Sequence, residues 1–403
     1  MLLGMSNPES SAERPGTGPE LGGGLKAASG RRLGWLLAAL GAAGLLIASV
    51  SRPADAGSAA AQDWSPFVLV AGLLLIGVVA AADGLFDAAG YQLARLARSG
   101  PLLFIGAAAM TGVVTALLNL DTSVAFLTPV FVATARSRGS GEAPLLYGCL
   151  LVSNAGSLFL PGSNLTNLIV LGSRHLSGAS FLAHMWGPAL AALVVTTLVV
   201  ACFERGAPGA SSEHLSPARR PTLGLGLGAV VVATVVVVST ASPALPVAVV
   251  GVIAIAIRLL TGKDHPRHVV EALGVPVLLG LFGVAVALGT LGRVWSGPST
   301  LLSHLDVWGT AVVAAICSVL FNNLPAASLL ASRVPSHPFA LLIGLNLGPN
   351  LFVTGSLAWI IWLRVARSAG ATPSIARATR LGAVAVPLSI AAAVAVLVLM
   401  GSG

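Results

Sequence analysis

The chain has 403 residues, of which 56% are hydrophobic and 9% are charged, and its mean hydropathy is +0.91. A soluble globular domain carries about 25% charged residues, so the composition excludes an ordinary soluble protein and makes lipid the main solvent. The net charge is +8, but the basic residues lie in short loops between apolar runs. This distribution argues against a nucleic-acid partner and is typical of the sorting of positive charge across a membrane.

Residues 1–30 are rich in Gly, Pro, Ser and charged residues, which predicts a disordered cytoplasmic tail. Arg31, Arg32, the apolar run 33–50 and the small residues at 54–56 together resemble a signal peptide with its cleavage site. The tail before this run is long, and further apolar runs follow it. We therefore expect a retained first helix.

Apolar runs long enough to cross a bilayer follow along the chain, since about 17 residues suffice for a helix. They are residues 33–50, 66–82, 145–171, 181–202, 222–240, 245–260, 275–291, 341–363 and 381–400. Between the second and third runs, residues 83–100 mix apolar and charged residues. That pattern predicts a helix lying at the membrane interface.

Two more apolar stretches, 102–136 and 310–332, have polar, turn-forming residues in the middle, at 119–122 and 322–325. Each stretch suits either a pair of short spans or a re-entrant hairpin. With the N-terminus in the cytoplasm and both stretches as hairpins, 18 of the 22 Lys and Arg residues lie inside. The four outside are Arg52, Arg174, Arg293 and Arg333. The charges therefore favour an inner hairpin and an outer hairpin in a multi-pass protein of the inner (plasma) membrane.

The order of elements then repeats. Residues 31–202 read span, span, inner hairpin, broken span at 145–171 and span, and residues 245–403 repeat that order with a broken span at 341–363. The linker 203–244 contains one odd helix, which gives the halves opposite orientations. The sequence thus predicts an all-α polytopic membrane protein with the inverted-repeat ion transporter fold, two re-entrant hairpins and two broken helices. Such repeats are typical of secondary transporters, with the site at the repeat interface.

Polar breaks occur at both hairpin tips and within both broken spans. Unwound backbone at membrane depth is tolerated only where it is buried in protein or lines a cavity, and half-helix ends with Asn, Ser and Thr side chains can supply ligands. The predicted substrate-binding residues are Asn119, Thr122, Asn154, Ser157, Ser163, Asn164, Asn167, Asn322, Asn323, Asn350, Thr354 and Ser356. The alternative for these asparagines, and for Asn346, is a helix–helix contact.

Asp121 is the acidic residue expected deep in the membrane, because the others fall in loops, tails or span ends. A charged Asp at the bilayer centre costs about 2.5–3.5 kcal/mol, and no Lys or Arg falls in a deep span to pair with it. We therefore predict that Asp121 couples transport to a proton or another cation. The alternative is a structural role as the cap of the hairpin's second helix.

Other residue types suggest less specific roles. Cys149, Cys202 and Cys317 lie in apolar stretches without disulfide or CxxC spacing, so we interpret them as small buried hydrophobes, with binding of a soft metalloid as the alternative. His184 is interpreted as a helix-contact residue, the alternative being a proton relay. Tryptophans near span ends predict aromatic belts; they are Trp35, Trp64, Trp186, Trp359 and Trp362. No catalytic, cofactor or metal-site motif is found, so an ATP-driven pump would need a separate ATPase subunit.

Several short motifs resemble those of a known family. In the first half they are Asn-Leu-Asp at 119–121, Leu-Thr-Pro at 127–129, Asn-Ala-Gly-Ser at 154–157 and Ser-Asn-Leu-Thr-Asn at 163–167. In the second half they are Asn-Asn-Leu-Pro at 322–325, Gly-Pro-Asn at 348–350 and Gly-Ser-Leu-Ala at 355–358. Over roughly residues 33–400 the chain resembles arsenite permeases, the arsenical pump membrane proteins of the ion transporter superfamily. Sodium/proton antiporters and divalent-anion/sodium symporters belong to the same superfamily.

The resemblance implies proton-coupled efflux of arsenite or antimonite, hairpins that face the substrate, and a homodimer. The chain departs from the family at the first tip, where Leu120 separates Asn119 from Asp121 and Thr122 replaces a glycine. No Arg is placed to clamp a carboxylate. Two alternatives within the superfamily are therefore a sodium/proton antiporter and a dicarboxylate-type anion transporter, whereas a channel needs no paired breaks.

Overall fold

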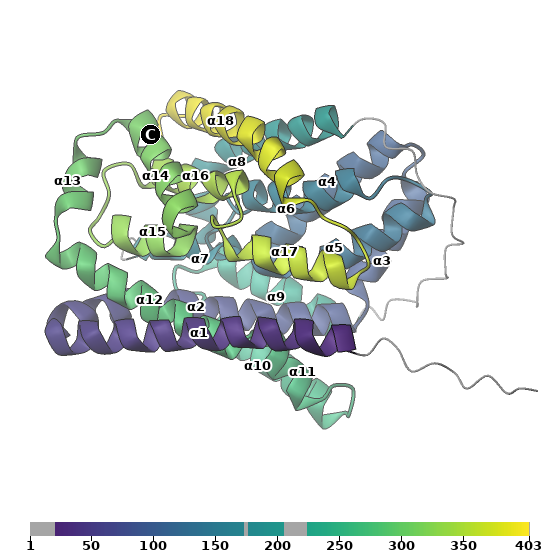
Figure 1. Cartoon of the computed structure of the whole chain (residues 1–403), viewed down its shortest axis with the longest axis horizontal. Coiled ribbons are helices and arrows are strands. Elements are labelled where there is room, and N and C mark those ends of the chain that lie inside the picture. Colours follow the sequence, from purple (N-terminus) through teal and green to yellow (C-terminus); the bar gives the residue numbers. More distant parts are fainter. Residues whose placement is uncertain (1–20, 173–175, 205–223, 403) are drawn as a thin grey trace, which may run out of the picture.

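A computed structural model describes residues 21–172, 176–204 and 224–402, which form helices and 3₁₀ turns without any strand (Figure 1). The first half contains α1 Leu21–Ser51, α2 Pro53–Ala82, α3 Leu85–Leu96, α4 Gly100–Leu117, α5 Leu120–Ser137, α6 Ala143–Gly156, the 3₁₀ turn η1 Pro161–Ser163, α7 Leu165–Leu171 and α8 Gly178–Phe203. The helix α9 Leu225–Ser239 follows. The second half contains α10 Ala244–Leu260, α11 Pro266–Leu273, α12 Val275–Val294, α13 Gly297–Ser303, α14 Val307–Phe321, α15 Asn323–Leu330, α16 Pro338–Leu347, the 3₁₀ turn η3 Gly348–Leu351, α17 Leu357–Ser368 and α18 Ile375–Leu399.

The helices agree in large part with the predicted spans. Among the described residues, six helices are long and apolar enough to cross a membrane. They are α2, α4, α8, α12, α18 and residues Gly34–Ser51 of α1. Shorter apolar helices form much of the remainder, among them α6, α9, α10 and α14. The predicted odd helix is α9, and the predicted interfacial helix is α3.

The structure differs from the prediction at the predicted tail and linker. Residues 21–30 belong to α1, whereas the sequence predicted a disordered tail over 1–30; residues 1–20 lie outside the described part of the chain. In the predicted linker 203–244, residues 205–223 also lie outside it. Two short helices, α11 and α13, were not predicted, because each has too few residues to show a clear apolar period.

Both predicted hairpin stretches form two helices joined at a polar tip. The first consists of α4 and α5, joined at Leu118 and Asn119, and its two ends lie together because Arg138 Nη2 donates to the carbonyl of Ala97 over 2.6 Å. The second consists of α14 and α15, joined by Asn322, which has a positive φ of 75°. Entry into the membrane and return on one side stay predictions for both pairs.

Helix packing follows the internal repeat. α1 packs against α12 of the other half, and its counterpart α10 packs against α2. Likewise, α5 packs against α17, and its counterpart α15 packs against α7. Helices α1, α2, α10 and α12 lie along the lower side of Figure 1, whereas α14, α16 and α18 lie on the opposite side. The halves are therefore intertwined rather than separate.

Glycines allow the closest of these cross-repeat contacts. A Cβ on Gly41 of α1 would lie 2.1 Å from the carbonyl oxygen of Gly280 in α12, and a Cβ on Gly251 of α10 would lie 2.7 Å from that of Gly72 in α2. Small residues are the usual means by which membrane helices approach closely. The pairing of α1 with α12 and that of α10 with α2 both depend on glycine at the point of closest approach.

The broken spans lie at the centre of the protein. Every residue of α16 is buried, and so are residues 145–156 of α6. A helix that is apolar on all sides needs partners on all sides, and both helices have them. The polar residues that interrupt these spans are consequently held inside the protein, away from lipid.

Charged residues pair at helix ends. Glu204, at the end of α8, is 5% exposed and accepts from Arg377 of α18 over 2.8 and 2.5 Å. Arg258, at the end of α10, is 7% exposed and donates to Asp83 and Asp264. The Glu204–Arg377 and Arg258–Asp83 pairs join elements that are distant in sequence and so fasten helix ends to one another, whereas Asp264 lies just after α10.

The contact between α18 and the turn η3 predicts the effect of one substitution. A Cβ on Gly382 of α18 would lie 1.9 Å from the carbonyl oxygen of Asn350 in η3, so Gly382→Ala forces backbone to move. Overpacking of this kind costs about 1–3 kcal/mol, and we expect a lower melting temperature of the purified protein. The matched control is Gly228→Ala in α9, where a Cβ meets nothing within 4 Å. Equal melting temperatures for the two variants would contradict the prediction.

Candidate substrate site

Asn346 of α16 is the centre of a hydrogen-bond network that joins the two broken spans. Its Oδ1 accepts from Ser157 Oγ over 2.8 Å and from Asn164 Nδ2 over 2.6 Å. Its Nδ2 donates to Asn167 Oδ1 and to the carbonyl of Leu342, both over 2.8 Å. The side chain of Asn346 is fully buried. All four of its hydrogen-bonding positions are therefore used inside the protein.

A second amide pair extends this network. Asn154 Nδ2 donates to Asn350 Oδ1 over 2.8 Å, and Asn350 Nδ2 donates to the carbonyl of Leu151 over 3.0 Å. Ser163 Oγ donates to the carbonyl of Ser157 over 2.8 Å and closes the turn in the first broken span. The breaks of the two broken spans are thus joined side chain to side chain, as the predicted repeat requires for a shared interface. The amide oxygen of Asn154, Oδ1, is buried without a hydrogen-bond partner.

Two tryptophans complete the hydrogen bonds of the broken spans. Trp359 Nε1 donates to the carbonyl of Pro349 over 2.8 Å, and Trp362 Nε1 donates to that of Leu146 over 2.9 Å. Both side chains are fully buried, so the prediction that these two belong to an aromatic belt is wrong. Large rings with one polar atom suit a buried position where that atom reaches a carbonyl. Trp35, Trp64 and Trp186 are exposed, as belt residues are.

The first hairpin tip differs from the central network because its polar atoms lack partners. Asn119 caps α5, its Oδ1 accepting from the backbone N–H of Thr122 over 2.7 Å. The remaining polar atoms, namely Asn119 Nδ2 and the hydroxyls of Thr115, Thr122 and Ser123, are buried without a hydrogen-bond partner. Buried polar groups are nearly always paired in proteins. Four unpaired atoms over nine residues therefore leave hydrogen-bonding capacity at this tip for a polar ligand.

Asp121 lies in the first turn of α5, beside this cluster, and is partly buried. Within the described part of the chain, no hydrogen bond or ion pair to its carboxylate is found. The interpretation of Asp121 as the cap of α5 is wrong, because Asn119 holds the cap position. The N-terminal end of a helix favours a negative charge, which is compatible with a carboxylate there.

The tip is enclosed by neighbouring helices. A Cβ on Gly77 of α2 would lie 2.6 Å from Thr122 Cγ2, and a Cβ on Gly156 of α6 would lie 3.3 Å from Thr115 Cβ. The tip therefore packs between α2 and the end of α6, where the first broken span is interrupted. The predicted substrate-binding residues of the tip and of this interruption thus lie on neighbouring elements.

The second hairpin tip is hydrogen-bonded to residues 354 and 355, in the break of the second broken span. Asn322 Nδ2 donates to the carbonyl of Thr354 over 3.1 Å, and the Asn323 N–H donates to that of Gly355 over 2.8 Å. Thr354 Oγ1 in turn donates to the carbonyl of Val319 over 2.7 Å. Ser356 Oγ is buried without a partner. These bonds hold Asn322 at its positive φ and leave one free hydroxyl beside it.

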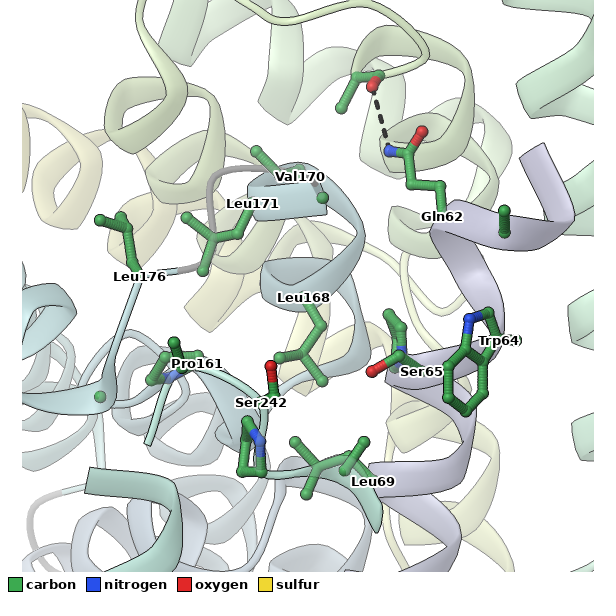
Figure 2. A pocket seen from close by; sticks show the side chains of 18 of the residues that line it. Gln62, Trp64, Ser65, Leu69, Pro161, Leu168, Val170, Leu171, Leu176 and Ser242 are labelled. Atoms are coloured by element: carbon green, nitrogen blue, oxygen red, sulfur yellow. Dashed lines mark hydrogen bonds between the residues drawn. The ribbon is translucent and has the colours of Figure 1, made fainter. Parts of the chain in front are cut away.

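A cavity of about 930 Å³ lies beside the first broken span, and none of the predicted site residues lines it. Figure 2 shows part of its wall, with Gln62, Trp64, Ser65 and Leu69 of α2, Leu168, Val170 and Leu171 of α7, and Ser242 between α9 and α10. The sequence reasoning missed this cavity because α2 begins at Pro53, 13 residues before the predicted span. Polar residues such as Gln62 and Asp63 were therefore assigned to a loop. Asp63 is 2% exposed, so Asp121 is not the only acidic side chain inside the bundle.

Comparison with known proteins identifies relatives that agree with this architecture. The profile of the family CitMHS, described as "Citrate transporter", matches residues 28–353. The "Inner membrane protein YbiR" of Escherichia coli (strain K12) is 28% identical over 314 residues, 76% of this chain and 81% of that protein. The "Arsenical pump membrane protein" of the same strain is 25% identical over 375 residues, 83% of this chain and 86% of that protein. The predicted resemblance to the arsenical pump group is thereby confirmed.

A solved structure shows the fold. The YdaH transporter of Alcanivorax borkumensis, reported to have an unusual topology, superposes with a TM-score of 0.50 at 15% identity, covering 83% of this chain and 84% of that chain. The predicted class, an all-helical protein with several membrane spans, is confirmed at this level.

Proposed function

The chain belongs to the CitMHS family of citrate transporters and is a multi-pass secondary transporter rather than an enzyme, and we propose that it exchanges protons for a small polar solute. We propose the inner membrane, which the name of the relative YbiR supports, and a cytoplasmic N-terminus, which the distribution of Lys and Arg supports. The first substrate we propose is arsenite or antimonite, as in the arsenical pump relatives.

The observation that carries this proposal is the set of unpaired buried atoms at the first hairpin tip. Asn119 Nδ2 can donate, and the hydroxyls of Thr115, Thr122 and Ser123 can donate or accept. Arsenite is an uncharged trihydroxide near neutral pH, and its hydroxyls need both kinds of partner. An uncharged solute needs no arginine or lysine to bind it. Among the described residues, none forms an ion pair with Asp121 at this tip.

Asp121 is the coupling group in this proposal. Its carboxyl group can bind or release a proton, and a solute that needs the charged form, or the space that the proton occupies, competes with the proton. Proton release on one side and uptake on the other then drive the solute. Asp121 directly precedes Thr122 and Ser123 in the first turn of α5, so a solute held by their hydroxyls would lie within one helical turn of it.

A citrate-like carboxylate is the second candidate. It is favoured by the description of the family and by two arginines, Arg293 and Arg333, in the wall of the cavity beside α7. Against it, the first tip offers no arginine to a carboxylate.

Purified protein in proteoliposomes tests the proposal directly. A pH-sensitive dye inside the vesicles reports proton movement when arsenite, antimonite, citrate, succinate or sodium is added outside. Proton movement with arsenite or antimonite alone supports the first candidate, whereas movement with citrate or succinate alone replaces it by the second. Movement with sodium alone would instead make the protein a sodium/proton antiporter, and no movement or uptake with any solute would refute the proposal.

A further inference from the structure

The cavity beside α7 lies at a junction of both halves of the protein. Its wall includes residues of α2 and α7 from the first half and residues around the ends of α12 and α15 from the second. The carbonyl of Arg293 at the end of α12 accepts from Arg333 Nη2 over 2.8 Å, so these two arginines lie together. Both belong to the four basic residues that the charge pattern assigns to the outside.

Gln62 fastens this junction. Its Nε2 donates to the carbonyl of Ile169 in α7 over 3.0 Å. It also donates to the carbonyl of Ala331, after α15, over 3.4 Å, the bond drawn as a dashed line in Figure 2. Its Oε1 accepts from Arg293 Nη2 over 2.6 Å. One side chain thus joins α2, α7, α12 and the second hairpin, and it holds the Arg293 guanidinium in a defined orientation at the wall.

Among the described residues, the charged groups that line the cavity are both cationic. Arg293 and Arg333 line the cavity, whereas Asp63 and Asp55, the carboxylates whose field reaches Arg293, do not. Arg293 Nη1 donates to the carbonyl of Gly289 over 3.0 Å and Nη2 to Gln62. A guanidinium has five N–H donors, so donors remain on Arg293, and hydroxyls of Ser58, Ser65 and Ser242 also line the wall.

We propose that this cavity binds a small carboxylate or oxyanion at a site separate from the first hairpin tip. Arginine recognises both groups through paired, charge-assisted hydrogen bonds, and a volume of about 930 Å³ accommodates an anion of the size of citrate. The cavity binds anions at the end of the protein that the distribution of Lys and Arg assigns to the outside of the membrane. This site does not depend on the identity of the solute bound at Asp121.

The test measures binding by full-length purified protein. Radiolabelled citrate and radiolabelled sulfate are the probes in equilibrium dialysis, and the quenching of Trp64, which lines the cavity, gives a second readout. Arg333→Gln is the main variant because Arg333 is exposed and tolerates replacement; Arg293→Lys keeps the charge and removes the paired donors. We expect each to weaken binding by about tenfold or more. Arg52→Gln, at an exposed position away from the cavity wall, is the matched control.

The outcomes separate this site from the transport site. Binding of citrate or sulfate that is weakened by Arg333→Gln and kept in Arg52→Gln and Asp121→Asn supports the proposal, even if the protein moves no anion. Trp64→Phe should remove most of the fluorescence change and keep the dialysis signal. Absence of binding, equal binding by Arg333→Gln and the wild type, or a loss of binding in Asp121→Asn equal to that in Arg333→Gln would overturn it.

Discussion

Asp121→Asn is expected to abolish solute-driven proton movement while the protein stays folded. Asparagine has nearly the same shape and can occupy the same place in the first turn of α5, but it cannot release a proton. Asp121 has no ion-pair partner among the described residues whose charge would be left uncompensated by this change. The proton flux of proteoliposomes containing the variant should fall to that of protein-free vesicles, while elution volume and melting temperature remain close to those of the wild type.

The control for this variant is Asp87→Asn, at an exposed position of α3, which removes the same charge without touching the hairpin tip. It should transport like the wild type. An Asp121→Asn variant that still exchanges protons for solute at the wild-type rate would exclude Asp121 as the coupling group. Solute uptake that continues without proton movement would instead show that binding and coupling reside in different residues.

Asn346→Leu is expected to cause the largest loss of stability among single substitutions in the broken spans. Leucine has a similar volume but leaves Ser157, Asn164 and Asn167 without their buried partner. An unsatisfied buried polar group costs about 1–3 kcal/mol, and hydrogen bonds between membrane helices average about 0.6 kcal/mol. We therefore expect a loss of about 2–4 kcal/mol, measured by denaturant unfolding of the purified protein.

Ser389→Ala supplies the comparison. Ser389 is equally buried, but its hydroxyl donates to the carbonyl of Val386 within α18 and joins no second element. Its loss should cost about 1 kcal/mol or less. If Asn346→Leu unfolds at the same denaturant concentration as Ser389→Ala, the amide network contributes no stability between the two halves.

Much of the candidate site was visible in the residue pattern. Asn119 and Asp121 interrupt an apolar stretch, and such an interruption has few explanations at membrane depth. The partners of these residues were not visible. Nothing near Asn154 in sequence indicates that it bonds to Asn350, 196 residues away, because hydrogen bonds between helices follow from packing. For the same reason Asn346 could not be identified as the centre of the network.

The cavity shows a second limit of sequence reasoning. Hydropathy predicted a span that begins at residue 66, since Asp55, Gln62 and Asp63 lower the local average. The helix nevertheless extends from Pro53 to Ala82, and its polar part is covered by α7 and α12. A polar segment is stable as helix when other helices shield it from lipid, and hydropathy averages contain no information on that shielding.

The sequence by itself determined the class of protein, most of its apolar helices and the places where helices break. These properties depend on local composition, because each span must suit lipid and each break must expose backbone groups. Only the tertiary structure decided which polar residues satisfy one another and which stay unpaired. That decision depends on contacts across the repeat: the amides of the broken spans bond to each other, whereas the polar atoms beside Asp121 have no counterpart within reach.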